Sequence, residues 1–410
     1  IPSRFPMGTP KYDIGIIGSG IIGLATAMRL SHEHPRSKIV VVEKESQIAQ
    51  HQTGHNSGVI HAGIYYAPGS QKANFCSTGG AMLRRFCDQH EVPYEMCGKL
   101  IVAVDESEVP GLEELFRRGT ANGADGLEIL GQERLREIEP HAAGVKAIWS
   151  PNTGIVDYDD VSTAYCDEMR DSGGELIADA EVVGTERRDG TICLETTAGD
   201  VEVGNVINCA GLHADSVALM MGQDVGVRII PFRGEYLSLK PEKTHLVNGL
   251  IYPVPDPRLP FLGVHFTKRI SGSVEAGPNA VLARKREGYS KTSFDWGDTV
   301  DALKFPGFWR MSRKYWKVGI SEQYRSVIRS AFVSSLQTLI PELQDQDLHQ
   351  PGAGVRAQAV DAAGNLVQDF SIAQTENAIH VVNAPSPGAT SSLAISRYIV
   401  DLAKRSFDLN

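Results

Sequence analysis

The pattern of apolar and polar positions near the N-terminus predicts a strand, a helix and a second strand in close succession. Residues 14–17 form a short apolar, β-branched run, which is typical of a strand buried on both faces. Residues 24–30 are good helix formers, and the apolar residues 38–42 predict the second buried strand. This order of elements is typical of a dinucleotide-binding fold.

The same periodicities predict the elements of the remaining chain. Helices are expected at residues 70–90, within 109–138 (two helices separated at 123–126), from the segment 154–160 up to 172, within 294–343 and at 391–406. Strands are expected at 100–104, 176–177, 180–183, 206–211 and 380–383, with a hairpin-like piece over 184–203. The strand-like runs 228–239, 250–253, 262–266 and 272–283, which prolines interrupt, suit an antiparallel sheet of a second domain.

The predicted strands at 206–211 and 380–383 return to the first sheet, so the sequence predicts a nucleotide-binding domain that is split along the chain. The predicted fold class is α/β, a Rossmann-like domain with an inserted mixed β-sheet plus helices. A cofactor domain interrupted in this way is more typical of FAD enzymes than of NAD dehydrogenases. The predicted domains are 1–95, 151–225 and 346–410 for the nucleotide domain, and 96–150 and 226–345 for the inserted substrate domain.

The turn after the first strand carries the sequence G-S-G-I-I-G. Gly18 permits a tight turn, Gly20 lets the backbone approach a pyrophosphate, and Gly23 lets the helix pack closely against the strand. Glu43 ends the second strand, about 20 residues after the last glycine of the motif, where this fold places its ribose-binding acid. The motif therefore predicts a dinucleotide site, and a tight turn without a ligand is the alternative.

Composition narrows the class of protein. Hydrophobic residues make up 42% of the 410-residue chain and charged residues 22%, which is typical of a globular protein. The net charge of −10 argues against a nucleic-acid partner. The six cysteines show no zinc-ligand spacing, so no metal site is expected. We expect the cysteines to be buried free thiols. No apolar run of about 20 residues predicts a transmembrane helix.

Several stretches resemble a known family. The glycine motif with Glu43, the loop 54–63, and the segments 208–211 and 387–390 resemble the D-amino-acid oxidase superfamily of FAD oxidoreductases. Four stretches resemble, more narrowly, the L-2-hydroxyglutarate dehydrogenase family: residues 55–66, 253–257 with 261–266, 276–280, and 354–359.

The resemblance implies non-covalent FAD and oxidation of L-2-hydroxyglutarate to 2-oxoglutarate, with hydride transfer from C2 to flavin N5. It further implies a quinone or another electron acceptor, a mitochondrial location in a eukaryote, and the cytoplasmic face of the inner membrane in a bacterium. A related flavoenzyme acting on glycerol 3-phosphate or an amino acid is one alternative. A flavin-binding protein without turnover is another, and His55 as a covalent flavin attachment point is a third hypothesis.

Two histidines are candidates for the catalytic base, because the unperturbed pKa of histidine lies near working pH. His265 is the first choice, and His61, which the resemblance places beside the isoalloxazine ring, is the second. Either histidine could instead only hydrogen-bond to backbone or flavin. A dicarboxylate also calls for cations and hydroxyl donors. The substrate-binding candidates are Arg356, Tyr252, Arg233, Lys72 and Gln358, with Arg269 as a further cation and a structural ion pair as the alternative for Arg233.

The resemblance extends the cofactor-binding set beyond the glycine motif. The full set is Gly18, Ser19, Gly20, Ile22, Gly23, Glu43, Lys44, Gly54, His55, Ser57, Gly58, Val59, Val182, Ala210, Gly211, Gly354, Arg356, Gly388, Ala389 and Thr390. The segment 304–317, within the helical, basic and aromatic region 300–343, suggests peripheral membrane contact. The alternative is an amphipathic helix whose basic side faces water.

Overall fold

The computed structural model describes residues 11–188, 190–256, 261–407 and 409. The N-terminal residues 1–10 of the first predicted domain and Pro257 of the family-like stretch lie outside the described residues.

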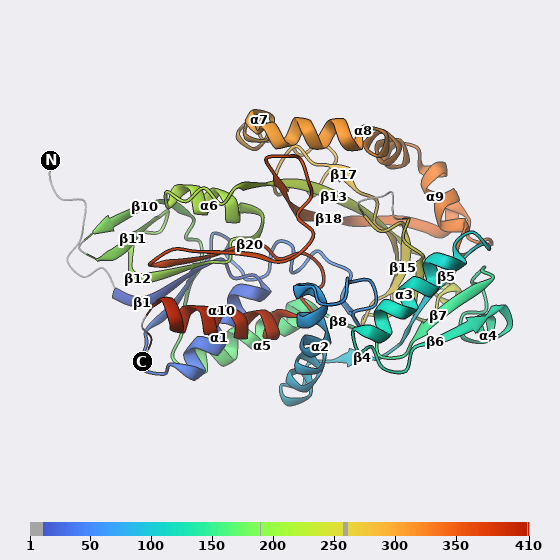
Figure 1. The fold of residues 1–410 in the computed structure, drawn as a ribbon, viewed down its shortest axis with the longest axis horizontal. Helices are drawn as coiled ribbons and strands as arrows, with labels where there is room; N and C mark the ends of the chain where they lie inside the picture. The colour runs from blue at the N-terminus through green and yellow to red at the C-terminus, as the bar shows by residue number, and fades with distance from the viewer. Residues whose placement is uncertain (1–10, 189, 257–260, 408, 410) are drawn as a thin grey trace.

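An eight-stranded sheet forms one half of the molecule (Figure 1). Its parallel core runs in the order β9 (Glu175–Ile177), β2 (Ile39–Val42), β1 (Lys11–Ile17), β12 (Val201–Asn208) and β20 (Ala378–Asn383). The strands β10 (Val182–Arg188), β11 (Thr191–Thr196) and β19 (Ser371–Gln374) add to it in antiparallel pairs. Every residue of β2 and of β20 is buried, because helices cover one face and further apolar side chains cover the other.

Helices cover this sheet unequally. The helices α1 (Ile21–Glu33), α5 (Tyr158–Asp171) and α10 (Ser392–Ser406) pack together on one face, where their apolar side chains meet those of β1, β2 and β20. The short helix α6 (Ala214–Met220) lies on the other face with the β10–β11 hairpin. The last helix therefore completes the layer that the first helix begins, as Figure 1 shows by their colours.

A nine-stranded sheet forms the other half. Its order is β17 (Val281–Leu282), β13 (Val227–Leu239), β16 (Val274–Gly277), β15 (His265–Lys268), β14 (Leu250–Pro253), β5 (Lys99–Ala103), β7 (Lys146–Ser150) and β6 (Glu128–Gly131), and β18 (Leu348–Asp361) pairs with β13. One face packs against α9 (Arg329–Gln337) and α4 (Gln132–Ile138), and the opposite face packs against α3 (Val109–Ala121).

The remaining elements join or flank the two halves. The strands β3 (Val59–Ile60), β4 (Tyr94–Glu95) and β8 (Gly154–Val156) form a small sheet, and α2 (Gln71–Gln89) contacts α10. The helices α7 (Trp296–Lys304) and α8 (Pro306–Val327) lie on the side of the molecule opposite α1, α5 and α10 (Figure 1). Three short 3₁₀ helices complete the described residues: η1 (Gly211–His213), η2 (Pro241–Leu246) and η3 (Asp345–Asp347).

Three sequence predictions need correction. The nucleotide domain was predicted to resume at residue 346, but β18 pairs with β13 in the nine-stranded sheet, so the return to the first sheet comes after residue 361. Within the predicted helical region 109–138, residues 128–131 form β6, because they pair with β7. The strand predicted at 262–266 is shifted and begins at His265.

A buried ion pair links the two halves. Asp215 of α6 is fully buried and accepts hydrogen bonds from both terminal nitrogens of Arg286, at 2.5 and 3.0 Å. Arg286 also donates to the carbonyl of Leu212 at 2.6 Å. Because removing one partner of such a pair leaves the other charge buried and uncompensated, this contact couples the stability of the two halves.

We expect the substitution Arg286→Met to lower the free energy of unfolding by about 3–5 kcal/mol, because the Asp215 carboxylate would remain buried without its cation. Urea unfolding followed by circular dichroism measures this change. The control is Arg117→Met, which removes a surface arginine whose ion-pair partner among the described residues is its helix neighbour Glu114, and it should leave the unfolding midpoint nearly unchanged. Equal midpoints for the two variants would contradict the expectation.

Candidate functional site

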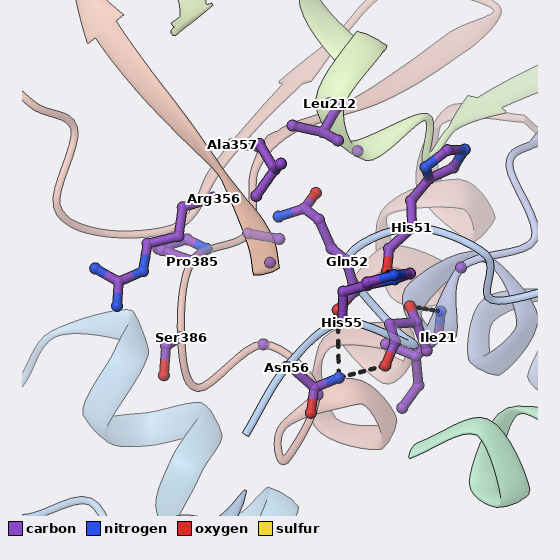
Figure 2. A pocket seen from close by; sticks show the side chains of 18 of the residues that line it. Ile21, His51, Gln52, His55, Asn56, Leu212, Arg356, Ala357, Pro385 and Ser386 are labelled. Atoms are coloured by element: carbon purple, nitrogen blue, oxygen red, sulfur yellow. Dashed lines mark hydrogen bonds between the residues drawn. The ribbon is translucent and has the colours of Figure 1, made fainter. Parts of the chain in front are cut away.

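A cavity of about 1110 Å³ lies between the two sheets. The carboxyl ends of β1 and β2, the segment 49–66, one face of the nine-stranded sheet and the loop before α10 line it. Figure 2 shows Arg356 of β18 and Ser386 on one side of the open space, with Gln52, His55 and Asn56 on the other. Ligands of open α/β sheets bind at the carboxyl ends of the strands, and this cavity has that position.

The glycine motif adopts the geometry that its spacing predicts. Gly18 has φ +102°, and a Cβ there would lie 2.7 Å from the carbonyl oxygen of Cys209. A Cβ on Gly23 would lie 2.1 Å from the carbonyl oxygen of Gly18, so α1 packs directly on the turn. A Cβ on Gly20 would meet only Thr53 Oγ1, at 3.4 Å. Gly20 lines the cavity at the N-terminus of α1 and has no side chain with which to cap the helix, while the Ile21 N–H donates to Thr53 Oγ1 at 3.0 Å. This geometry fits the pyrophosphate of a dinucleotide.

Glu43 is held at the end of β2 by the glycine turn. Its carboxylate accepts hydrogen bonds from the Ser19 N–H at 2.7 Å, from the Ser19 hydroxyl at 2.8 Å and from the Glu45 N–H at 3.0 Å. The carboxylate also lines the cavity, where its remaining lone pairs can accept hydrogen bonds from ribose hydroxyls.

A charged cluster from both halves borders the same part of the cavity. The Glu287 carboxylate lies 2.5 Å from Lys44 Nζ, 2.9 Å from His213 Nε2 and 3.4 Å from His51 Nε2. Burial opposes ionisation of Glu287, but the hydrogen bonds from His213 and Lys44, with the nearby Lys44 charge, hold its pKa well below the usual value. Glu45, His51 and Glu287 have the composition of a metal site. The Lys44 ammonium, however, already bonds to both carboxylates, and this favours an ion-pair cluster.

The two candidate histidines lie in the part of the cavity that we call the histidine end, formed by His61, Tyr65, Tyr252, His265 and Arg356. The rings of Tyr252 and His265 are 4.0 Å apart between centroids. His265 Nδ1 lies 2.9 Å from the carbonyl oxygen of Gly263, so Nδ1 carries the proton and Nε2 is left as the acceptor. His61 Nε2 lies 3.4 Å from Ser386 Oγ, and its buried Nδ1 has no hydrogen-bond partner among the described residues.

Burial and nearby cations keep both imidazoles neutral. Burial, with further contributions from Lys99 and His265, lowers the pKa of His61 to about 3. Burial lowers the pKa of His265 to about 3 as well. The hydrogen bond to Gly263 opposes this shift, and the charges of Arg356 and Lys99 add to it. A neutral imidazole is the form that can take a proton.

Cationic side chains are available for an acidic ligand. The Arg356 guanidinium lies over the ring of Phe261, 5.1 Å from its centroid, and lines the cavity. Lys72 of α2 also lines the cavity, and burial lowers its pKa to about 8 while the charge of Asp369 opposes this shift. The Gln358 amide lines the cavity too, but it already donates to the carbonyls of Ala359 and Val367.

Some predicted residues lie beside the cavity rather than in its wall. Arg233 is buried and bonds to Glu235 at 2.9 Å and to the Ser290 carbonyl at 2.7 Å, which is the structural ion pair that the sequence left open. Arg269 bonds to the Asn56 carbonyl and lies 3.4 Å from Glu275. Ser19, Gly23, Gly54 and Gly58 support the wall through hydrogen bonds or close packing. The predicted residues in the wall are Gly18, Gly20, Ile22, Glu43, Lys44, His55, Ser57, Val59, Val182, Ala210, Gly211, Gly354, Gly388, Ala389 and Thr390, together with His61, Lys72, Tyr252, His265, Arg356 and Gln358.

In the loop before α10, the Thr390 side chain forms hydrogen bonds to the backbone of the segment 59–61. The Thr390 hydroxyl accepts from the His61 N–H at 3.2 Å and donates to the Val59 carbonyl at 3.1 Å. The Gly388 N–H donates to the Pro385 carbonyl at 2.9 Å, so this N–H already has a partner within the loop.

Sequence reasoning missed Lys99, which contacts the rings of Tyr65 and Tyr252. A signal was present: in a strand of period two, Lys99 shares a face with Ile101 and Ala103, both of which are fully buried. A lysine at an inward-facing position is unusual and marks a functional candidate.

The chain matches known proteins over nearly its full length. Residues 13–402 match the family model described as FAD dependent oxidoreductase. The chain is 47% identical over 397 residues to an L-2-hydroxyglutarate dehydrogenase of Indibacter alkaliphilus, which covers 97% of this chain and 100% of the relative. It is 46% identical over 418 residues to the mitochondrial L-2-hydroxyglutarate dehydrogenase of Homo sapiens, covering 98% and 90%. These matches confirm the resemblance found from the motifs and the prediction of an oxidoreductase.

Solved structures confirm the predicted fold class. The chain superposes with a TM-score of 0.80 on the L-alpha-glycerophosphate oxidase of Mycoplasma pneumoniae with FAD bound, at 23% identity over 96% of this chain and 95% of the other. A glycine oxidase of Bacillus cereus gives a TM-score of 0.70 at 17% identity over 96% and 95%. At these identities the likeness concerns the fold.

We expect Gly20→Ala to weaken dinucleotide binding by about tenfold or more, because the added methyl group occupies the space in which the backbone meets the pyrophosphate. Absorbance of bound cofactor after gel filtration measures retention, and thermal unfolding of the stripped protein should be unchanged. The control Gly319→Ala adds a methyl group on α8 where nothing lies within 4 Å, and it should retain the cofactor. Full retention by Gly20→Ala would overturn the assignment of this turn.

Proposed function

Because the chain belongs to the family of FAD-dependent oxidoreductases, we propose that it oxidises the hydroxyl group of L-2-hydroxyglutarate to give 2-oxoglutarate. The observation that carries the proposal is the histidine end of the cavity, where two neutral imidazoles lie beside the Arg356 cation. The names of the relatives that share nearly half of its residues support the choice of substrate.

Each group at the histidine end has a role in this proposal. Bound FAD supplies the acceptor for the hydride that leaves C2 of the substrate. His265 Nε2 takes the hydroxyl proton, since Nδ1 is committed to the Gly263 carbonyl. His61, with its unpartnered Nδ1, hydrogen-bonds to the substrate. Arg356 and Lys72 bind the carboxylates, and the Tyr252 hydroxyl assists them.

We also propose that FAD is bound non-covalently. His55 Nδ1 lies 3.0 Å from the carbonyl oxygen of His51, and its ring packs on Tyr289 with 4.3 Å between centroids. These contacts give His55 a structural role in the cavity wall. Loss of flavin from the Gly20→Ala variant on gel filtration tests this proposal too, because a covalently attached flavin would stay with the chain.

Under anaerobic conditions, L-2-hydroxyglutarate should bleach the flavin absorbance and D-2-hydroxyglutarate should not. His265→Ala should slow flavin reduction by about 10²–10⁴-fold, the usual contribution of a general base, while FAD stays bound. His245→Ala removes a histidine of the inserted domain that does not line the cavity, and it serves as the control. Stopped-flow absorbance gives both rates.

Several outcomes of this experiment are decisive. Normal reduction in both the His265→Ala and His61→Ala variants would remove histidine from the proton transfer. A yellow protein that is bleached instead by glycerol 3-phosphate or an amino acid would change the substrate. A yellow protein that responds to none of these compounds would be a flavin-binding protein without turnover.

The helices α7 and α8 support a second proposal, that the enzyme docks on a membrane surface and passes its electrons to a quinone. Among the described residues, no helix combines the length and hydrophobicity that spanning a bilayer requires. The alternative from the sequence is an amphipathic helix whose basic side faces water. Large apolar side chains of these helices are also exposed. The docking face, as we call this surface, consists of Trp296, Trp309, Trp316, Ile320, Tyr324 and Val327, which are between 56% and 76% exposed.

The docking face has the composition of an interfacial helix. Trp309, Trp316, Ile320 and Val327 recur at intervals that place them on one side of α8. The exposed cations Arg313, Lys314 and Lys317 come from the same helix. Tryptophan and tyrosine favour the headgroup region of a bilayer, and lysine and arginine favour anionic lipids. A lipid surface therefore fits this face.

Vesicles of mixed neutral and anionic lipid should carry the wild-type protein to the pellet on sedimentation. The double variant Trp309→Ser with Trp316→Ser should reduce the bound fraction about tenfold or more, because each indole contributes apolar burial in the headgroup region. Val183→Ser is the control, because Val183 is 56% exposed on the other half of the molecule. Equal binding by all three proteins, or none by wild type, would refute docking through this face.

A further inference from the structure

The nine-stranded sheet buries a lysine beside the cavity. Lys99 is the first residue of β5 and its side chain is only 1% exposed. It pairs in register with Ser150 of β7 and Leu250 of β14, so strands flank it on both sides. Lysine is almost never fully buried unless it is paired, because removing an ammonium group from water is costly.

The partners of Lys99 are aromatic rings. Its ammonium nitrogen lies 4.7 Å from the centroid of the Tyr65 ring and 4.9 Å from that of Tyr252. The two rings are 6.5 Å apart between centroids, and both tyrosines line the cavity. A cation between two ring faces fixes both rings, and desolvation strengthens the attraction.

No acidic group compensates this charge within the described part of the chain, where Lys99 forms no ion pair with any carboxylate. The titratable groups that face it are the Cys76 thiol of α2, the two tyrosines, His61 and His265. Burial raises the pKa of Cys76 to about 12 and that of both tyrosines above their usual value, so these groups are neutral at physiological pH. Burial lowers the pKa of Lys99 itself to about 8, so below that pH its positive charge acts on whatever occupies the histidine end.

Two further polar atoms at the histidine end have no partner among the described residues. The Tyr65 hydroxyl and His61 Nδ1 are both buried and form no hydrogen bond there. Buried polar groups in native proteins nearly always have a partner, so these two atoms indicate a polar ligand. They lie in the cavity wall next to the ring that Lys99 holds.

We propose that Lys99 is a positioning residue for the oxidation, acting through its ammonium group between Tyr65 and Tyr252. It holds the rings of Tyr65 and Tyr252 in the cavity wall, so that the unpartnered Tyr65 hydroxyl is available to the substrate, and it supplies positive potential at the histidine end. That potential attracts the anionic substrate, and it also disfavours protonation of His61 and His265, so that a neutral base is available. This inference rests on the proposed function, since it assigns a role in the same reaction.

The direction of the pH effect follows from the charges. Lys99 and Arg356 both lower the pKa of His265, whereas the hydrogen bond to Gly263 raises it. Removing the Lys99 charge takes away one of the two cations, so the imidazole gains protons at a higher pH than before. Flavin reduction should then lose rate on the acidic side at a pH where the wild-type enzyme still works.

Lys99→Met tests the proposal, because methionine keeps much of the length and apolar surface of lysine without its charge. The rate of flavin reduction is measured against L-2-hydroxyglutarate concentration from about pH 3 to 7, a range that includes the lowered pKa of the histidines and stays below that of Lys99. The dissociation constant of 2-oxoglutarate is obtained from its perturbation of the flavin spectrum. We expect weaker binding of 2-oxoglutarate by about tenfold and an acid limb displaced to higher pH. Lys99→Arg, which keeps the charge, should restore the wild-type pH profile at least in part.

The control variant is Lys146→Met. Lys146 lies on β7 at the other end of the same strand pair and forms a surface ion pair with Glu113. Lys146→Met removes the same charge at a residue that does not face the cavity. The 2-oxoglutarate binding and the pH profile of this variant should therefore match those of the wild type. Thermal unfolding of all variants shows whether they are folded, and if Lys99→Met does not fold, Lys99→Gln takes its place in the same comparison.

Three outcomes would separate the explanations. Wild-type binding and pH profile in the uncharged variant overturn the role of Lys99. An equal loss of rate in the Met and Arg variants, with no displaced acid limb, also overturns it and indicates packing alone. A wild-type flavin that no hydroxy acid reduces overturns the proposed function, and the role of Lys99 falls with it. In a wild type that responds, the first two outcomes overturn only the inference about Lys99.

Discussion

The ladder between β13 and β18 is the contact on which the geometry of the cavity depends. Its register runs from Val227 opposite Asp361 to Leu239 opposite Leu348, with one irregularity between Tyr236 and Ser238. Side chains alternate along a strand, so this register decides which residues of β18 face the cavity. It brings Arg356 to the wall, and it places Gly354 so close to His55 that a Cβ would lie 2.5 Å from the His55 carbonyl oxygen. A slip of one residue would turn the arginine away.

Desolvation dominates the electrostatics at the histidine end. It is the largest influence on the pKa of His61, His265, Lys72 and Lys99, and in each case it disfavours the charged form. The apolar faces of two sheets produce this effect, because they exclude water from the space between them. The same surroundings that stabilise the fold therefore keep the two imidazoles unprotonated, and they strengthen the attraction between an anionic substrate and those side chains that remain charged.

Local sequence patterns predicted many of the helices and strands. They did not predict which distant segments pair with one another. The G-x-G-x-x-G turn and Glu43 were predictable, because the chemistry of a phosphate turn is confined to a few consecutive residues. Family-like motifs pointed to His61, His265 and Arg356. The assignment of β18 failed because only its partner β13 identifies its sheet. Lys99 was missed because its environment is formed by Tyr65 and Tyr252, which lie far from it in sequence.

The split nucleotide domain has a consequence for synthesis of the protein. Leu24 and Leu30 of α1 are fully buried, and α1 packs directly against α10, the last helix of the chain. β20, which completes the parallel sheet beside β12, also comes from the last part of the chain. A growing polypeptide on the ribosome exposes these apolar surfaces until residues 378–406 have emerged. The sheet that β1 and α1 begin therefore cannot finish folding before those residues are synthesised, and truncation before α10 would uncover the apolar side of α1.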